Sequence, residues 1–235
     1  LTSLGAIVLN PMLYKDLPYN AEKDFAPVSL VVSSPTVLVV NPTHTSAKTA
    51  GELVAQSKAA ARPISIGSAG IGGTTHISYE MFTAASGAKL LHAPYKGAGP
   101  VISDLLAGQI GGFFGDLPGL ISNIQAGKLK ALGVLAKSRH PLIPDVATMA
   151  EQGFADVESE NWYAVVAPAK VPADVIASLN AAVRKALGAE AVRTKLMAAG
   201  TTLLPSTPEE VTALVAADTK RWGRIIKERN ITVEQ

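Results

Sequence analysis

Short apolar runs alternate along the chain with longer segments in which apolar residues recur every three or four positions. The short runs have the length and β-branched content of buried strands, and the longer segments have the period of amphipathic helices. We expect strands at residues 27–32, 37–40, 64–68, 90–93, 110–115, 129–135, 162–167 and 201–204. We expect helices at residues 49–61, 74–86, 100–107, 117–126, 172–187, 189–199 and 208–227. This alternation predicts an α/β fold in which the strands run largely parallel.

Two stretches interrupt the alternation and predict where the chain passes between lobes. In SLVVSSPTVLVV, two serines and Pro35 separate two strand runs, and in VESENWYAVVAP a polar segment precedes a strand. Proline and small residues between strands suit a hinge. We therefore expect two lobes, with residues 35–160 forming the second lobe and residues 1–34 and 161–235 forming a discontinuous first lobe. This is the layout of a hinged ligand clamp.

The last predicted helix carries a clear start signal and an apolar face. Thr207 can cap the helix and Glu210 can complete a capping box in the sequence TPEE. One face of the helix collects apolar side chains, which we expect to lie in the core: Val211, Leu214, Val215, Trp222, Ile225 and Ile226.

Composition narrows the class of protein. Of the 235 residues, 48% are apolar and 17% are charged, which is typical of a globular chain. The net charge of +2 comes without a basic run, so nucleic acid is not an expected partner. No apolar stretch reaches the roughly 18 residues that a membrane-spanning helix needs, so we expect no membrane span. The lack of cysteine excludes a thiol nucleophile and a cysteine-bound metal.

The chain opens on LTSLGAIVLNPMLY, without an initiating methionine, a basic leader or a signal-type cleavage site. This opening is typical of a segment that begins inside a domain, at the end of a strand. We expect the natural gene product to be longer at its N-terminus.

A glycine-rich turn joins the predicted strand 64–68 to the predicted helix 74–86. Its sequence, GSAGIGGTT, has the glycine spacing of a phosphate loop, but Gly73 stands where that loop needs lysine, so a nucleotide triphosphatase is not expected. The dinucleotide fingerprint also fails, because Thr75 replaces its third glycine. Backbone N–H groups at the start of the helix can hold a carboxylate or phosphate, helped by hydroxyls of Ser68, Thr74 or Thr75. The alternative is a plain turn that needs glycine for its dihedral angles.

The helix after this turn places His76 and Glu80 on one face. A metal site would need a third ligand at suitable spacing, and the sequence offers none, so we expect no metal and no cofactor. A catalytic triad of Ser68, His76 and Asp116 can be drawn, but Ser68 lacks the G-x-S-x-G elbow of a nucleophile. A hydrolase that uses Ser68 and His76 therefore remains only an alternative, and we expect no catalytic residues.

Three predicted strands end in polar residues, namely Ser68, Tyr95 and Asp116. Ligands of open α/β sheets gather at the carboxyl ends of strands, so these loops should converge on one rim. Asp116 can accept a hydrogen bond from a ligand, or it can cap the following helix. Taken by itself, the residue favours the cap.

Several segments, in this order, resemble the Bug family of periplasmic receptors of tripartite tricarboxylate transporters. They are NPMLYKDLPYNAEKDFAPVSLVVSSPTVLVVNP, GSAGIGGTTHISYEMF, HAPYKGAGPVISDLLAGQI, FFGDLPGLISNIQAGKLKALGV, PDVATMAEQGF and STPEEVTALVAADTKRWGRIIKERNI. The resemblance covers essentially the whole chain. It implies a two-lobed periplasmic-binding-protein fold of the Venus-flytrap type, in the periplasm.

By the same resemblance, the chain captures a small carboxylate, such as a di- or tricarboxylic acid, an acidic amino acid or an aromatic acid, and delivers it to a membrane permease. In the family the glycine-rich loop holds a ligand carboxylate largely through backbone N–H groups. The residues so implied here are Ser68, Ala69, Gly72, Gly73 and Thr74. The start of the chain, residues 3–6 with Ser3 first, resembles the opposing loop of the other lobe.

The chain departs from the family pattern in three places. Gly73–Thr74 stands where a Thr-Ser pair is expected, and the acid of the Phe-Asp-Asn-Leu-Pro motif is displaced by one residue to Asp116. The family also begins with a further strand–helix unit that carries another glycine-rich ligand loop, so the first lobe is expected to be incomplete. A sensory module that passes ligand occupancy to a membrane partner stays open beside transport.

Overall fold

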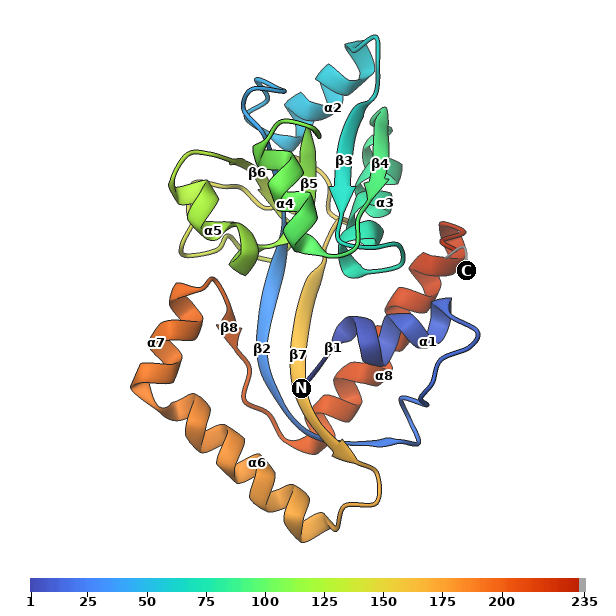
Figure 1. Ribbon diagram of the computed structural model, residues 1–235, viewed down its shortest axis with the longest axis vertical. Coiled ribbons are helices and arrows are strands. Elements are labelled where there is room, and N and C mark those ends of the chain that lie inside the picture. Colours follow the sequence, from blue (N-terminus) through green and yellow to red (C-terminus); the bar gives the residue numbers. More distant parts are fainter. Residues whose placement is uncertain (233–235) are drawn as a thin grey trace. The chain divides into compact units, whose positions relative to one another are not determined.

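The computed structural model describes residues 1–232, and the chain divides into two compact units. Unit 1 consists of Leu1–Ser34 and the described part of Asn161–Gln235, and unit 2 is Pro35–Glu160. The chain passes between them in two strands, β2 (Phe25–Val40) and β7 (Glu160–Pro168) (Figure 1).

The strand β2 is continuous, so the predicted break at Ser33, Ser34 and Pro35 is wrong. Val32 and Ser33 pair with β8 (Thr202–Leu203), and from Thr36 onward the strand pairs with β5 and β6. Pro35 falls between these two sets of pairs, where its missing N–H costs neither ladder a hydrogen bond. A proline inside a strand therefore marks the passage between units without ending the strand.

Unit 2 is a mixed sheet flanked by helices. Its strands are β3 (Ile64–Ser68), β4 (Leu90–Pro94), β5 (Gly112–Asp116), β6 (Lys130–Val134) and the second half of β2. Its helices are α2 (Ala50–Ala59), α3 (Thr74–Ser86), α4 (Ala98–Leu106), α5 (Leu117–Gln125) and a 3-10 turn at Ala150–Gln152. The helical crossovers make β3 parallel to β4 and β5, whereas β2 runs antiparallel to β5 and β6.

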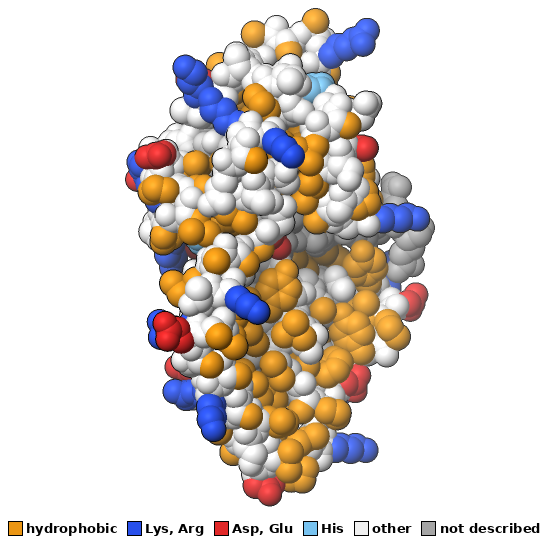
Figure 2. All heavy atoms as spheres, turned by 60° about the vertical axis from the view of Figure 1, so that its left-hand side comes forward, with side chains coloured by type: hydrophobic (Ala, Val, Ile, Leu, Met, Phe, Trp, Pro, Cys, Tyr) orange, Lys and Arg blue, Asp and Glu red, His pale blue; other side chains and the backbone are white. Residues whose placement is uncertain are grey.

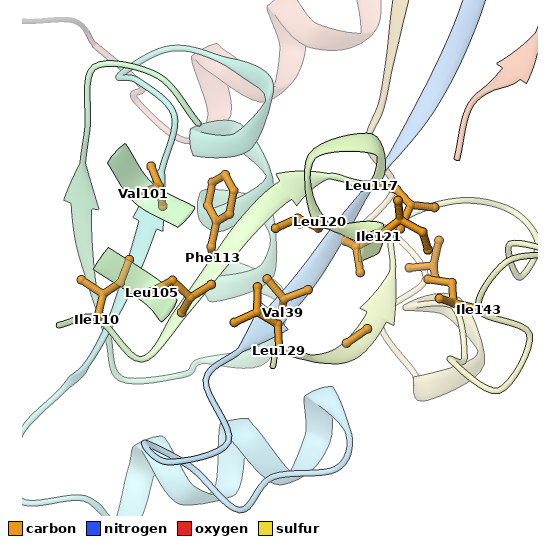
Figure 3. Packing of buried hydrophobic residues seen from close by; sticks show 13 residues of the cluster. Val39, Val101, Leu105, Ile110, Phe113, Leu117, Leu120, Ile121, Leu129 and Ile143 are labelled. Carbon is orange, nitrogen blue, oxygen red and sulfur yellow. The ribbon is translucent and has the colours of Figure 1, made fainter. Parts of the chain in front are cut away.

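An apolar cluster packs α4 and α5 against the sheet of unit 2. Figure 3 shows it from close by, with Val101 and Leu105 from α4, Leu117 and Leu120 from α5, and Phe113 from β5. Each of these side chains is at most 1% exposed. This core fixes the ends of β3 and β5, from which the polar loops emerge.

Unit 1 is built around the first half of β2 and β7. Its other elements are β1 (Thr2–Ser3), a π-helical turn (Gly5–Leu9), α1 (Asn10–Leu13), α6 (Ala173–Gly188), α7 (Glu190–Ala198), β8 and α8 (Pro208–Glu228). The short strand β1 pairs antiparallel with β7. The helical turns after it were not predicted from the sequence.

The helix α8 begins as the sequence predicts and covers one side of unit 1. The capping box of Thr207 and Glu210 is present in full. Of the predicted apolar face, Val211, Trp222 and Ile225 are buried. The indole N–H of Trp162 on β7 donates to Asp218 Oδ2 at 2.7 Å, which links the strand to the helix.

The helices α6 and α7 leave most of their side chains in solvent. In α6 the buried residue is Leu187, and Val175 and Leu179 are exposed, as is Met197 of α7. Figure 2 shows hydrophobic side chains gathered on the face of unit 1 that it displays. The amide of Asn180 attaches α6 to the sheet, because it donates at 2.7 Å to the carbonyl of Val28 on β2.

Among residues 1–232, the structure contains no helix with the length and apolar character needed to cross a bilayer.

Candidate functional site

The glycine-rich turn lies where the sequence predicts it, between the end of β3 at Ser68 and the start of α3 at Thr74. Gly72 has a φ of +77°, in the left-handed region that favours glycine. Gly67 serves packing instead, because a Cβ there would lie 2.5 Å from Val101 Cγ1 and 2.8 Å from Ile110 Cδ1. The first glycine of the apparent phosphate-loop spacing is thus explained by the core of unit 2.

Backbone hydrogen bonds hold the turn against the loop that follows β4. The Ser68 carbonyl accepts from the Tyr95 N–H at 3.0 Å, and the Ala69 carbonyl accepts from the Gly97 N–H at 2.9 Å. The Ala69 N–H donates to Thr75 Oγ1 at 2.9 Å, so the first turn of α3 reaches back to the strand end. The turn is therefore held at both of its ends.

A cluster of side chains supports the turn from behind. The Gly72 N–H donates to His76 Nδ1 at 3.0 Å, and His76 Nε2 lies 3.5 Å from Glu80 Oε1. Ser68 Oγ lies 2.7 Å from His92 Nε2 and 3.4 Å from the Gly70 carbonyl. Burial, and then the neighbouring His76 ring, lower the pKa of His92 from 6.5 to about 4.

These contacts divide the predicted ligand-binding residues into two groups. Ser68 and Thr75 are buried and use their hydroxyls inside the protein, and the N–H groups of Ala69 and Gly72 already donate to side chains. The other group is the start of α3. Its N-cap residue, Gly73, provides no side-chain cap among the described residues, and the N–H groups of Thr74 and Thr75 have no partner within the helix. The free donors therefore lie at the helix start.

The polar strand ends come together as the sequence predicts. Because β3 is parallel to β4 and β5, the loops that begin at Ser68, Tyr95 and Asp116 leave the same edge of the sheet. The Tyr95 hydroxyl donates to Asp104 Oδ2 at 2.8 Å, and burial, then Asp104, raises the pKa of Tyr95. The start of α3 follows the first of these loops, the one that begins at Ser68.

The preference for Asp116 as a helix cap is wrong. Asp116 does occupy the N-cap position of α5, but within the described chain its carboxylate makes no capping hydrogen bond. The backbone there is extended, with φ −69° and ψ 133°. The first turn of the helix contains a proline, which has no N–H, so this turn has one donor fewer that a cap could satisfy. Asp116 is partly exposed at the rim.

Ser3 lies in unit 1, on β1, where it pairs with Tyr163 of β7. Residues 3–6 run from this strand into the π-helical turn that begins at Gly5. The region that the sequence marks as a second ligand loop is therefore a strand end followed directly by a helical turn, without the glycine-rich turn that separates β3 from α3.

The catalytic triad that the sequence would allow, Ser68, His76 and Asp116, does not form. The partner of Ser68 is His92, a residue that the sequence analysis did not single out, and His76 bonds to the turn instead. The Ser68 side chain is also fully buried, with 0% exposure. Across residues 1–232, the structure holds no cluster of three or more His, Cys, Asp or Glu residues arranged for a metal ion.

Comparisons with known proteins agree on one family. A family model described as the tripartite tricarboxylate transporter family receptor, TctC, matches residues 2–231. Protein BugT of Bordetella pertussis is 32% identical over 227 residues, which cover 97% of this chain and 69% of BugT. The chain thus spans about two thirds of that relative's length.

Two solved structures resemble the chain in fold. The R. palustris protein Rpa4515 with adipate has a TM-score of 0.92 and 27% identity, over 98% of this chain and 77% of that one. MatC of Rhodopseudomonas palustris with bound malate has a TM-score of 0.85 and 28% identity, over 95% of this chain and 77% of that one. The fold is the two-lobed α/β fold of periplasmic binding proteins, as expected. The chain belongs to the TctC family of tripartite tricarboxylate transporter receptors, which are solute-binding proteins and include the Bug proteins.

Proposed function

We propose that this chain is a periplasmic receptor that captures a small carboxylate and delivers it to the permease of a tripartite tricarboxylate transporter. The observation that carries the proposal is the start of α3 at the polar strand ends of unit 2, where the N-cap residue Gly73 provides no side-chain cap. The N–H groups of Thr74 and Thr75 are free of helical partners there, and the helix dipole adds a positive potential. A carboxylate fits such a site without any catalytic group.

The remaining predicted residues have defined parts in this proposal. Gly72 and Gly73 shape the turn, and Ser68 and Ala69 anchor it to the loop after β4 and, through Thr75, to the first turn of α3. Asp116, on the same rim, would accept a hydrogen bond from a hydroxyl or amine of the ligand. In unit 1, Ser3 at the end of β1 is proposed as a ligand contact. Residues 1–34 and 161–235 are proposed as the first lobe and residues 35–160 as the second.

The energies favour a charged ligand. A hydrogen bond to a charged group contributes roughly 1.5–3 kcal/mol, and the helix dipole contributes about 0.3–1 kcal/mol when exposed and up to ~2 when partly buried. Two such bonds at Thr74 and Thr75 would therefore give a carboxylate several kcal/mol over its amide. The relatives with adipate and with malate support dicarboxylates as the first class to test.

The test is thermal unfolding with a panel of acids, comprising adipate, malate, citrate, glutamate and benzoate, and with the matching amides as controls. An acid at a hundred times its dissociation constant should add ~2.7 kcal/mol of stability. At roughly 2–4 °C per kcal/mol, the midpoint should rise by about 5–10 °C. A shift with one acid and none with its amide is the expected result. Equal shifts with acid and amide, or none with any acid, would overturn the proposal.

A further inference from the structure

Three aromatic rings stack behind the glycine-rich turn, and the carboxylate contacts proposed above use none of them. The rings of His76 on α3 and His92 on β4 have centroids 4.3 Å apart and lie 13° from parallel. The ring of Tyr79, also on α3, stacks on His92 at 4.9 Å. His76 is buried, with only 7% of its surface exposed. His76 therefore lies buried directly against the turn that is proposed to bind the carboxylate.

The hydrogen bonds of His76 define its protonation state. The Gly72 N–H donates to Nδ1 at 3.0 Å, so Nδ1 carries a lone pair and the ring is neutral. The proton then resides on Nε2, which lies 3.5 Å from Glu80 Oε1. A carboxylate beside one ring nitrogen favours the proton at that nitrogen. Glu80 therefore selects the tautomer that Gly72 requires.

We propose that His76 is a positioning residue for the carboxylate site, because its neutral ring holds the Gly72 peptide in the orientation that presents the start of α3. The proposal rests on the carboxylate-binding function stated above, and it adds a residue that acts through Gly72 without contacting the ligand. With φ at +77°, Gly72 has access to other backbone conformations at little cost, so the hydrogen bond to Nδ1 is what selects this one. A proton on Nδ1 would face the Gly72 N–H and release the peptide.

The groups that face the His76 ring come from three elements. Glu80 and Tyr79 face it from α3, His92 faces it from β4, and β3 supplies Ser68, which does not titrate. The pKa of His92 is lowered to about 4 by burial and then by His76, so His92 stays neutral where an ordinary imidazole titrates. Burial raises the pKa of Tyr79, which also stays neutral.

Two substitutions at His76 separate positioning from packing. The Oδ1 of asparagine can stand where Nδ1 stands and accept from Gly72, but it cannot be protonated, whereas alanine offers no acceptor. The affinity for an acid from the thermal panel is measured by calorimetry for the parent protein and both variants. The Gly72 amide signal of the ligand-free protein is recorded by ¹H–¹⁵N NMR for the same three proteins.

We expect His76→Asn to bind like the parent protein, because its amide oxygen still accepts from the Gly72 N–H. We expect His76→Ala to bind roughly 5- to 150-fold more weakly, the range that corresponds to a buried N–H without an acceptor. Equal loss in both variants, or no loss in His76→Ala, would overturn the role of His76.

The NMR measurement decides the matter even if no acid binds. The Gly72 amide signal should move strongly in His76→Ala, which removes the acceptor, and stay near its parent position in His76→Asn. A Gly72 signal that moves equally in both variants, or in neither, would refute the positioning role. Failure of every acid in the panel, with the Gly72 signal responding as expected in both variants, would refute the carboxylate function alone.

Discussion

Replacing Thr74 with proline removes one N–H from the proposed carboxylate site while leaving α3 able to form. Thr74 is the first residue of the helix, where proline is favoured because that N–H has no intrahelical partner. Gly73 before it has φ −76° and ψ 169°, the extended backbone that a following proline requires. The helix should therefore tolerate Thr74→Pro with little loss of stability.

The loss of binding follows from the energy of one charged hydrogen bond. A hydrogen bond from a backbone N–H to a carboxylate contributes roughly 1.5–3 kcal/mol, which corresponds to a roughly 10- to 150-fold weaker dissociation constant. Calorimetric titration with the acid found in the thermal panel measures this change, and thermal unfolding without ligand checks that the variant is folded.

Two control variants isolate the N–H. Thr74→Ala removes the hydroxyl but keeps the N–H, so it should retain most of the affinity. Ala173→Pro places proline at the first residue of α6, after Pro172 with φ −58° and ψ 147°, and should leave binding unchanged. If Thr74→Pro is folded and binds the acid as tightly as the parent chain, the carboxylate is not held at the start of α3 and the reasoning is refuted.

Three further predictions concern the turn and its support. Gly72→Ala should lower the free energy of unfolding by about 1–2 kcal/mol in denaturant unfolding and weaken acid binding. The control Gly127→Ala, at a glycine with φ +68° and open space around its Cβ position, should lose as much stability but keep its binding. Equal affinity in both variants would contradict a role of Gly72 in the site. The folded-state pKa of His92 lies near 4, below the 6.5 of the unfolded chain, so the free energy of unfolding should fall as the pH drops from about 6.5 to about 4. The expected fall is roughly 1–2 kcal/mol after allowance for solvent screening. A pH profile of stability that is unchanged in His92→Asn would disagree with this. Ser68→Ala should leave any ester turnover of the preparation unchanged and bind acids with reduced affinity, whereas a turnover that disappears in this variant would favour a hydrolase.

The elements around the turn could be predicted closely from the sequence. The strand Ile64–Ser68 and the helix Thr74–Ser86 were expected at these same residues. Their boundaries are local, since a β-branched run ends at glycines and the helix ends at Gly87, whose φ of +62° forms a left-handed C-cap. Where one segment contains its own start and stop signals, the sequence alone is sufficient.

Features that depend on pairing partners could not be predicted in this way. A proline between serines predicts a break, but Pro35 is accommodated in β2 because different strands pair on either side of it. The contact between Ser68 and His92 depends on the parallel register of β3 and β4, which aligns Ile66 with His92. No spacing within the chain encodes that register. The helical turns at Gly5–Leu13 lack a side-chain cap in the described structure, and Pro11 in the first turn of α1 is the start signal that the sequence analysis missed.

The most direct test of the central claim is to follow the backbone amides by ¹H–¹⁵N NMR while the acid from the thermal panel is added. A carboxylate at the start of α3 accepts hydrogen bonds from the N–H groups of Thr74 and Thr75, so these signals should show the largest shifts in unit 2, with the amide analogue of the acid as control. Saturable binding of the acid that leaves both signals in place would contradict the claim.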